Sequence, residues 1–303
     1  MKHPSCLKQP PIHEHCHEVS EKTVAYLFIA FVIKMILSLL EIGGGLIAGS
    51  VSLIGDALHN TSDALSVLIA VIAFKIGRKK ADSTFTYGFK RAEIIGSFVN
   101  LILLFISGIY LAIESIGRLW RPEPVEGTII IWISILAVVI DAATAKLSHV
   151  HAADNTNMRM VFLHNLSDAL GSVGVIISGL LAVNLHIYRA DALIAIGIAT
   201  YMIYQAVVSF PHIVRILMNA APSGLDVSDI QKELQQINGI QNVHHMHVWH
   251  VNEHDISLEC HIVADDTQIV PIATRLLQKK FGINHCNIQI EKCADHCDCC
   301  LSH

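Results

Sequence analysis

Six stretches of about twenty mostly apolar residues fill most of the chain before residue 220, and they constrain its fold more than any other feature. A helix needs about 20 such residues to cross the hydrocarbon core of a bilayer. The stretches are Val24–Ala48, Ser52–Ile76, Ile94–Gly117, Ile129–Leu147, Val161–Val183 and Ala190–Leu217. We therefore expect an α-helical membrane protein with six transmembrane helices.

The composition agrees with a membrane location. Charged residues make up 16% of the chain and the mean hydropathy is +0.50, whereas about a quarter of the residues in a soluble chain are charged. The polar, histidine-rich first residues do not resemble a cleaved signal peptide. A net charge of −5, with no basic stretch that contains aromatic residues, gives no indication of a nucleic-acid partner.

Lysine and arginine residues are distributed unevenly between the two ends of these segments. One side has Lys2, Lys8, Lys22, Arg78, Lys79, Lys80, Lys90, Arg91, Lys146, Arg159 and Arg215, and the other has Arg118, Arg121 and Arg189. Positive residues near the ends of spans remain in the cytoplasm. Both termini are therefore predicted to be cytoplasmic.

The second and fifth segments contain the same polar motif. Each has the pattern His-Asn-x-Ser-Asp-Ala-Leu, beginning at His59 in one and at His164 in the other. Internal repeats of this kind mark transporter folds in which the site lies near the midplane, where the two halves meet. Ionisable groups at this depth are costly, and by default they are candidates for function.

Within each copy of the motif, the histidine and the aspartate are four residues apart, which places them on one face of a helix, one turn apart. If the two spans run in opposite directions, the histidine of one is level with the aspartate of the other. His59, Asp63, His164 and Asp168 would then supply two imidazoles and two carboxylates, a set that suits tetrahedral Zn²⁺. The alternative is two unrelated clusters that serve helix packing, and the repetition of the pair favours the metal site.

Other intramembrane polar groups leave alternatives open. Asp56 could hold the His59 imidazole, admit the ion or serve packing. Lys34, Glu41 and Asp141 could pair across helices or relay protons. Glycines in the first and fifth segments favour close helix approach over binding.

The chain changes character after Pro222 and predicts a small α+β domain of order αββαβ, with its helices on one face of the sheet. The expected helices are Asp226–Ile237, with Asp226 as N-cap, and Asp266–Phe281, and the expected strands are Asn242–Val251, Asp255–Val263 and Asn284–Glu291. The predicted parts are a cytoplasmic head over 1–22, a six-helix transport domain over 23–218, the α+β domain over 219–292 and a cysteine- and histidine-rich tail over 293–303.

Histidines and cysteines gather outside the spans. The main groups are His13, His15, Cys16 and His17, then His244, His245, His247 and His250, then Cys260 and His261, and finally Cys293, His296, Cys297, Cys299, Cys300 and His303. Their mixture favours metal ligation in a reducing compartment over disulfides. Cys297 and Cys300 have the spacing of half a zinc site, and a redox pair or an unstructured metal-scavenging tail are the alternatives.

These residues together resemble the cation diffusion facilitator family of zinc transporters, from about Val24 to Glu291. The resemblance rests on the two His-x-x-x-Asp pairs, on Tyr87-Gly88-Phe89-Lys90-Arg91-Ala92-Glu93 and on the His244-x-x-His247-Val248-Trp249 strand. It implies a homodimer with a cytoplasmic ferredoxin-like domain, and Zn²⁺ efflux driven by inward proton movement.

By the same resemblance, His59, Asp63, His164 and Asp168 are transport ligands, and His244, His261 and Glu291 are cytoplasmic zinc ligands. The run His15-Cys16-His17 is similar to a head motif that reaches into the cytoplasmic site. The short connection between the fourth and fifth spans fits a bacterial member, in the inner membrane.

Two other classes of function are weaker. An intramembrane zinc enzyme would need an open coordination position, and the chain has no His-Glu-x-x-His motif. A membrane zinc sensor would bind metal without moving it, whereas a repeated site at matching depth favours a pathway. We therefore expect a transporter and not an enzyme, with Zn²⁺ as its ion and Cd²⁺, Co²⁺ or Ni²⁺ as further candidate substrates.

Overall fold

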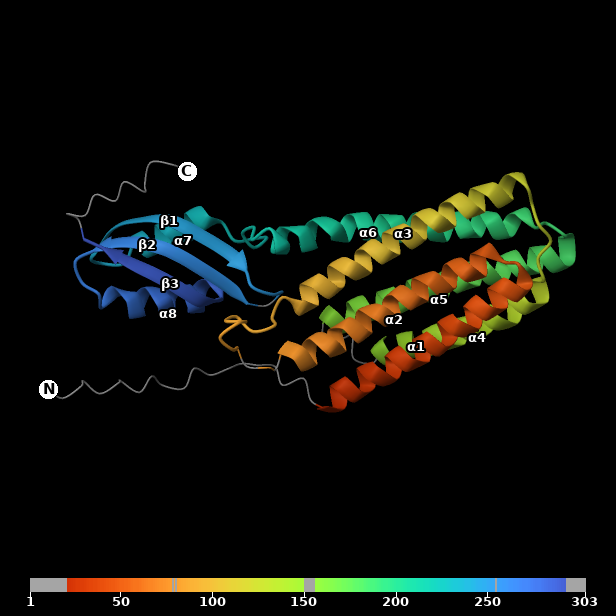
Figure 1. The fold of residues 1–303 in the computed structure, drawn as a ribbon, viewed down its shortest axis with the longest axis horizontal. Helices are drawn as coiled ribbons and strands as arrows, with labels where there is room; N and C mark the ends of the chain where they lie inside the picture. Colours follow the sequence, from red (N-terminus) through yellow and green to blue (C-terminus); the bar gives the residue numbers. More distant parts are fainter. Residues whose placement is uncertain (1–20, 78, 80, 150–155, 254, 293–303) are drawn as a thin grey trace.

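A computed structural model describes residues 21–77, 79, 81–149, 156–253 and 255–292 (Figure 1). It contains a bundle of long helices followed by a smaller domain at one end. The bundle helices are α1 (Glu21–Ala48), α2 (Val51–Gly77), α3 (Ala92–Trp120), α4 (Gly127–His149), α5 (Thr156–Leu185) and α6 (Arg189–Leu217). Their positions match the six expected segments to within a few residues.

Five of the described helices are long and apolar enough to cross a membrane, namely α1, α3, α4, α5 and α6. Helix α2 has the length, but its N-terminal half carries the polar residues of the repeat motif and it is not among the five. It packs against α1, α3, α5 and α6. Helix α2, with the polar residues of its motif, is thus enclosed by four neighbouring helices, which reduces its exposure to lipid.

The helices approach closely where glycines remove side-chain bulk. A Cβ atom on Gly44 of α1 would lie 1.9 Å from Ile133 of α4, and one on Gly127 of α4 would lie 2.5 Å from the carbonyl oxygen of Gly179 on α5. The predicted packing role is supported for Gly44 and Gly179. At Gly43, by contrast, an added Cβ would meet no atom within 4 Å.

The end of the bundle far from the small domain is held by a buried carboxylate (Figure 1). Asp191 on α6 accepts hydrogen bonds from the hydroxyls of Ser50 at 2.6 Å and Ser52 at 2.5 Å. It also accepts from the Val51 amide at 2.8 Å, one of the N–H groups that a helix start leaves without an intrahelical partner. Asp191 therefore caps α2 and fixes the α1–α2 turn to α6.

The small domain consists of α7 (Val227–Gln235), β1 (Ile240–His250), β2 (Ile256–Ala264), α8 (Ile269–Phe281) and β3 (Ile283–Glu291). This is the predicted order, and Asp226 caps α7 as expected by accepting from the Ser228 amide at 2.8 Å. Strand β2 lies in the middle of the sheet, antiparallel to β1 and parallel to β3.

One face of this mixed sheet forms the core of the domain. Alternate residues of β2, Leu258, Cys260 and Ile262, are buried against Leu234 of α7 and Leu277 of α8. The intervening residues of β2 point to the opposite face, because successive side chains of a strand alternate. That second face has no helix among the described residues, and it carries the histidines considered below.

The Asp191 cap predicts a stability effect. The Asp191→Ala variant leaves two buried hydroxyls and an amide without their charged acceptor, and we expect the free energy of unfolding to fall by about 3 kcal/mol. Thermal unfolding of the purified protein in detergent measures the change. Glu126→Ala, at an exposed position at the same end of the bundle, is the control. An unchanged unfolding midpoint for Asp191→Ala would contradict the proposed cap.

Candidate metal centres

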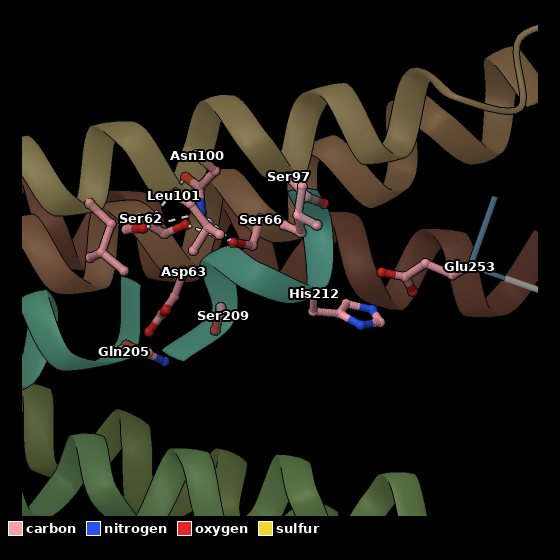
Figure 2. A pocket seen from close by; sticks show the side chains of 12 residues that line it. Ser62, Asp63, Ser66, Ser97, Asn100, Leu101, Gln205, Ser209, His212 and Glu253 are labelled. Atoms are coloured by element: carbon pink, nitrogen blue, oxygen red, sulfur yellow. Dashed lines mark hydrogen bonds between the residues drawn. The ribbon is translucent and has the colours of Figure 1, made fainter. Parts of the chain in front are cut away.

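A polar cavity of about 470 Å³ lies between α2, α3, α6 and the segment that joins β1 to β2. Figure 2 shows Asp63 at one side of it and His212 and Glu253 toward the small domain. Its polar lining consists of Ser62, Asp63, Ser66, Ser97, Asn100, Gln205, Ser209, His212 and Glu253. Water and ions can therefore reach Asp63 from the end of the bundle that carries the small domain.

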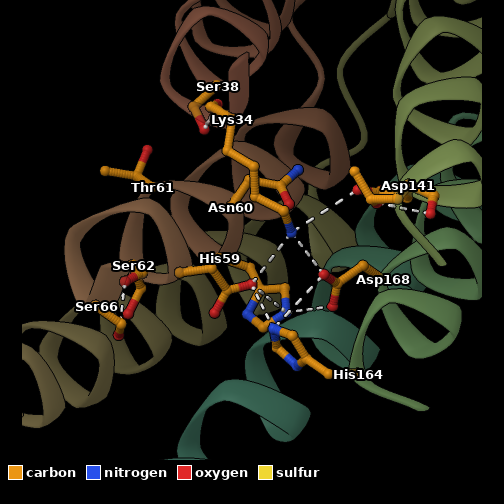
Figure 3. Close-up of polar contacts among 12 residues, drawn as sticks. Lys34, Ser38, His59, Asn60, Thr61, Ser62, Ser66, Asp141, His164 and Asp168 are labelled. Atoms are coloured by element: carbon orange, nitrogen blue, oxygen red, sulfur yellow. Dashed lines mark hydrogen bonds and ion pairs between the residues drawn. The ribbon is translucent and has the colours of Figure 1, made fainter. Parts of the chain in front are cut away.

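The two copies of the repeat motif meet beside this cavity (Figure 3). His59 Nε2 on α2 lies 3.3 Å from Asp168 Oδ1 on α5, and His164 Nε2 on α5 lies 3.2 Å from Asp63 Oδ2 on α2. Within each helix, the histidine nitrogen and the aspartate oxygen are 3.7 Å apart. The arrangement expected from two opposed helices is therefore present, with each histidine facing the aspartate of the other helix.

These separations suit a tetrahedral ion. Donor atoms at about 2.0–2.2 Å from a tetrahedral Zn²⁺ lie roughly 3.3–3.6 Å from one another. The four nitrogen–oxygen separations span 3.2–3.7 Å, with Asp168 facing His59 through Oδ1 and His164 through Oδ2. The ligand atoms of His59, Asp63 and Asp168 all lie within 4.8 Å of one another. His164 is the most exposed of the four, with 35% of its side chain accessible, and its ligand atom lies outside that group. Three ligands are therefore close enough to share a divalent ion, and His164 has to move closer to complete a tetrahedral set.

A lysine lies directly against this quartet. The ammonium of Lys34, on α1, donates a hydrogen bond of 2.8 Å to Asp168 and lies 3.8 Å from both Asp63 and Asp141. Of the alternatives that the sequence left open for Lys34 and Asp141, pairing across helices is the one seen. Its partners include two of the candidate ligands, which the sequence analysis did not anticipate.

Two further acids lie nearby. Glu41 is buried and accepts from the Asn60 amide at 3.0 Å, and Asp56 accepts from the Ser172 hydroxyl at 2.7 Å. The Nδ1 atom of His59 has no hydrogen-bond partner in the described chain. The interpretation of Asp56 as the acceptor that holds the His59 imidazole is therefore wrong for this structure, and Asp56 links α2 to α5 through Ser172.

An aromatic neighbour of the quartet comes from α6. The Tyr201 ring lies edge to face with His59, with 5.5 Å between the ring centroids. Nothing in the spacing of α6 singles out Tyr201 from the other apolar and aromatic residues of that helix. Its position becomes apparent from the packing of α6 against α2.

A second cluster lies on the open face of the sheet. His244 of β1 and His261 of β2 are register partners, and Glu291 ends β3 beside them. The Glu291 carboxylate lies 2.8 Å from His261 Nδ1 and 3.2 Å from His244 Nε2. The ligand atoms of these three residues lie within 4.8 Å of one another, so the structure brings together the three candidates predicted for a cytoplasmic site.

The cysteines of the sheet do not join this cluster. Cys260 belongs to the helix-covered core, and burial, reinforced by Cys286 and Glu259, raises the pKa of its thiol to about 12. Burial also raises the pKa of Cys286 to about 11. Cys260 lies on the helix-covered face of the sheet, opposite His261, and neither Cys260 nor Cys286 belongs to a group of candidate ligands in the described chain, so the structure does not support metal ligation by these two cysteines. The other candidates, His15, Cys16, His17, Cys297 and Cys300, lie outside the described residues.

The small domain contacts the bundle through the connection between α2 and α3. Lys90 of this connection donates a hydrogen bond of 2.7 Å to Asp255, which lies just before β2. Burial alone would raise the pKa of Asp255, but the hydrogen bond and charge of Lys90 outweigh it and hold that pKa below its usual range. The Tyr87 ring lies 5.6 Å from the His285 ring of β3, measured between centroids. Arg91, next in sequence to Lys90, donates a hydrogen bond to the Asn219 side chain after α6.

Comparisons with known proteins find matches over nearly the whole of the described chain. Residues 27–218 match the cation efflux transmembrane domain, and residues 222–293 match the cytoplasmic domain of cation efflux proteins. The chain is 33% identical over 287 residues to a cadmium, cobalt and zinc/H(+)-K(+) antiporter of Bacillus subtilis, which covers 92% of this chain and 91% of that relative. It is 30% identical to the zinc transporter ZitB of Escherichia coli, with 92% of each chain covered. It is 27% identical to the metal cation efflux system protein CzcD of Cupriavidus metallidurans, with 91% and 89% covered.

The sheet cluster predicts zinc-dependent stabilisation of the small domain. The Glu291→Gln variant removes the carboxylate that both histidines face, and we expect the zinc concentration needed for half-maximal thermal stabilisation to rise about 10- to 100-fold. Differential scanning calorimetry of the full chain in detergent, repeated over a range of zinc concentrations, measures this half-maximal concentration. Glu259→Gln on β2, which faces Asn287, is the matched control. The cluster would be rejected as a site if both variants responded to zinc like the parent protein.

Proposed function

The chain belongs to the cation efflux family, and on that basis we propose that it exports Zn²⁺ from the cytoplasm in exchange for protons. The observation that carries the proposal is the quartet of His59, Asp63, His164 and Asp168, in which each histidine faces the aspartate of the other helix at 3.2–3.3 Å and three of the four ligand atoms already lie within 4.8 Å of one another. The relatives named for zinc, cadmium and cobalt transport support the same class of substrate. Cd²⁺, Co²⁺ and Ni²⁺ are proposed as secondary substrates, because such donor sets discriminate poorly among these ions.

Charge balance favours a divalent cation at this position. Asp63 and Asp168 together carry two negative charges, and neutral His59 and His164 add none. A doubly charged ion therefore cancels the carboxylate charge in a region where net charge is expensive. Two imidazole nitrogens favour Zn²⁺ and similar transition metals over Mg²⁺ and Ca²⁺, which prefer oxygen ligands.

We propose that all six long helices cross the membrane, with α2 sheltered by the other five. The four-part division at residues 22, 218 and 292 is proposed with it, and the two family matches support its central boundary. The excess of lysine and arginine at the small-domain end supports cytoplasmic termini and a cytoplasmic, ferredoxin-like domain. We place the protein in the inner membrane of a bacterium, as its bacterial relatives suggest.

The mechanism we propose is alternating access. Zn²⁺ enters through the polar cavity that leads to Asp63 and binds the quartet with both histidines deprotonated. The two repeat halves then move relative to one another and expose the ion to the other side. There, protons compete for the imidazoles, which ordinarily titrate near pH 6.5. Metal and protons exclude one another on the same nitrogen atoms, so the two fluxes are coupled at the site itself.

The transport ligands give the direct test. We expect His59→Ala or Asp168→Ala to lower Zn²⁺ uptake into inverted vesicles by at least about 100-fold, because each removes a ligand and leaves its facing partner unpaired. Uptake is measured with an imposed pH gradient and again after that gradient is collapsed. Thr61→Val is the matched control, since Thr61 lies between the two α2 ligands but donates to the Ala57 carbonyl of its own helix.

Normal Zn²⁺ uptake by both ligand variants would refute the transport site. Uptake that is lost in the variants but unaffected by the pH gradient would refute the exchange for protons and leave the site in place.

We further propose that the protein is a homodimer and that zinc in the cytoplasmic cluster stabilises the dimer and adjusts transport to the cytoplasmic zinc level. The match to the cytoplasmic domain of cation efflux proteins supports assembly through this domain. The cluster of His244, His261 and Glu291 supplies the zinc-responsive element.

A chain that ends at Pro222 tests this role. We expect it to lose the mass of a dimer in light scattering and to lose the rise of transport rate with cytoplasmic zinc, since the sheet cluster is removed. The Glu291→Gln full chain is the companion variant, which retains the domain but lacks the carboxylate. Dimeric mass and zinc dependence that both survive truncation would exclude a regulatory role for the domain.

A further inference from the structure

The Lys34 ammonium contacts the two carboxylates that the transport site would also use to hold a metal ion. Lys34 is buried, and its nitrogen is 2.8 Å from Asp168 and 3.8 Å from Asp63 (Figure 3). Those two carboxylates come from α5 and α2, whereas Lys34 comes from α1, outside the repeated motif. The same pair of acids therefore faces two cations, one covalently attached to the protein and one transported.

Both cations cannot hold Asp168 equally well. A metal ion coordinated by Asp168 at about 2 Å and an ammonium at hydrogen-bond distance from the same carboxylate would bring like charges close together in a poorly solvated interior. Their mutual repulsion weakens whichever interaction already exists. Zinc binding and the Lys34–Asp168 hydrogen bond are consequently competitive.

Asp141 provides a second partner for the displaced ammonium. Its side chain on α4 is fully buried, neither carboxylate oxygen accepts a hydrogen bond in the described chain, and one of them lies 3.8 Å from the Lys34 nitrogen. The Lys34 nitrogen has to move only about 1 Å closer to Asp141 for this pair to become hydrogen-bonded. Asp141 would then neutralise Lys34 and leave Asp63 and Asp168 to balance the two charges of Zn²⁺.

We propose that Lys34 is a tethered counter-cation of the transport site, which pairs with Asp168 when the site has released its metal and with Asp141 when metal is bound. This inference rests on the proposed function, since it concerns the same quartet. The Lys34–Asp168 pair matters after the ion has been released and while the empty site returns to the cytoplasmic side. Two adjacent carboxylates would otherwise be left without a cation inside the bundle during that step. The competition also weakens zinc binding and so assists release.

The competing interpretation is that Lys34 forms a purely structural ion pair. Substitutions of Lys34 and of Asp141 distinguish a structural pair from a counter-cation. With Lys34→Met, the competitor is lost, so the KM for Zn²⁺ should fall by about tenfold while kcat also falls, because release and return become slower. With Asp141→Asn, the lysine loses its second partner and remains on Asp168, so the KM should rise by about tenfold. A structural pair predicts that both variants weaken zinc binding together.

The measurement is zinc flux into proteoliposomes made with the full chain, over a range of zinc concentrations. Lys34→Arg keeps the charge and should lie closer to the parent protein than Lys34→Met does. Lys146→Met, at an exposed position on the same helix as Asp141, is the control and should change neither constant. Opposite KM shifts in Lys34→Met and Asp141→Asn support the counter-cation, and shifts of the same sign or no shift overturn it.

A second measurement separates this inference from the proposed function. Zinc-dependent thermal stabilisation is followed in detergent, with Glu291→Gln present in every variant to remove the sheet cluster. Lys34→Met should need less zinc for half-maximal stabilisation and Asp141→Asn more. Those shifts without any zinc flux in the parent protein would refute export and leave the counter-cation standing. Flux in the parent with unchanged zinc requirements in both variants would refute the counter-cation alone.

Discussion

The cost of negative charge inside an apolar helix bundle determines how this protein is built. Asp63, Asp141 and Asp168 face one another across α2, α4 and α5, and Lys34 is the cation that lies among them. Removing one partner of a buried charge pair costs about 3–5 kcal/mol because the other charge is left without compensation. An interior of this kind is stable when a cation is bound to it. That requirement explains why a lysine lies beside the site, and it favours the divalent ion proposed to bind there.

The two ends of the bundle are built differently around this charged centre. At the far end, Asp191 fixes the start of α2 to α6, and the Arg118 guanidinium donates to the Gly49 carbonyl of the α1–α2 turn at 2.6 Å. At the end near the small domain, a polar cavity separates α2 from parts of α3 and α6 and reaches Asp63. The described structure is therefore tied at one end and has a cavity at the other, an arrangement that suits one of the two conformations of the proposed alternating access.

The sequence predicted those features that depend on local spacing. The His-x-x-x-Asp pairs had to share helix faces, whereas Cys260 and His261, which the sequence grouped as candidate ligands, lie on opposite faces of the sheet because strand residues alternate. Pairing across helices was one alternative for Lys34 and Asp141, but their contacts with the quartet and the place of Tyr201 could not be predicted. These contacts join residues of different helices that are 29 or more positions apart, where periodicity gives no signal. Helix α2 shows that hydropathy alone can miss a helix of the bundle. Its polar residues lower the apolar signal of a helix that its neighbours shelter from lipid.

Contacts between the small domain and the bundle would allow metal binding at the sheet cluster to act on the proposed transport site. Asp255 accepts from Lys90 of the α2–α3 connection, and it also pairs with Asn284 at the start of β3, whose last residue is Glu291 of the sheet cluster. A shift of β3 that accompanies the proposed metal binding at Glu291 would therefore act on Asp255 and, through Lys90, on the connection that follows α2, the helix whose N-terminal half carries His59 and Asp63. Since the folded-state pKa of Asp255 is lowered, its pairing with Lys90 contributes stability above the ordinary aspartate pKa and loses it as the pH falls through the lowered value. The Lys90–Asp255 link therefore stays intact at neutral pH. On the proposed mechanism, protons there compete with metal for the histidine nitrogens of the sheet cluster as well as for those of the quartet, while the Asp255 carboxylate that joins the domain to the bundle stays ionised.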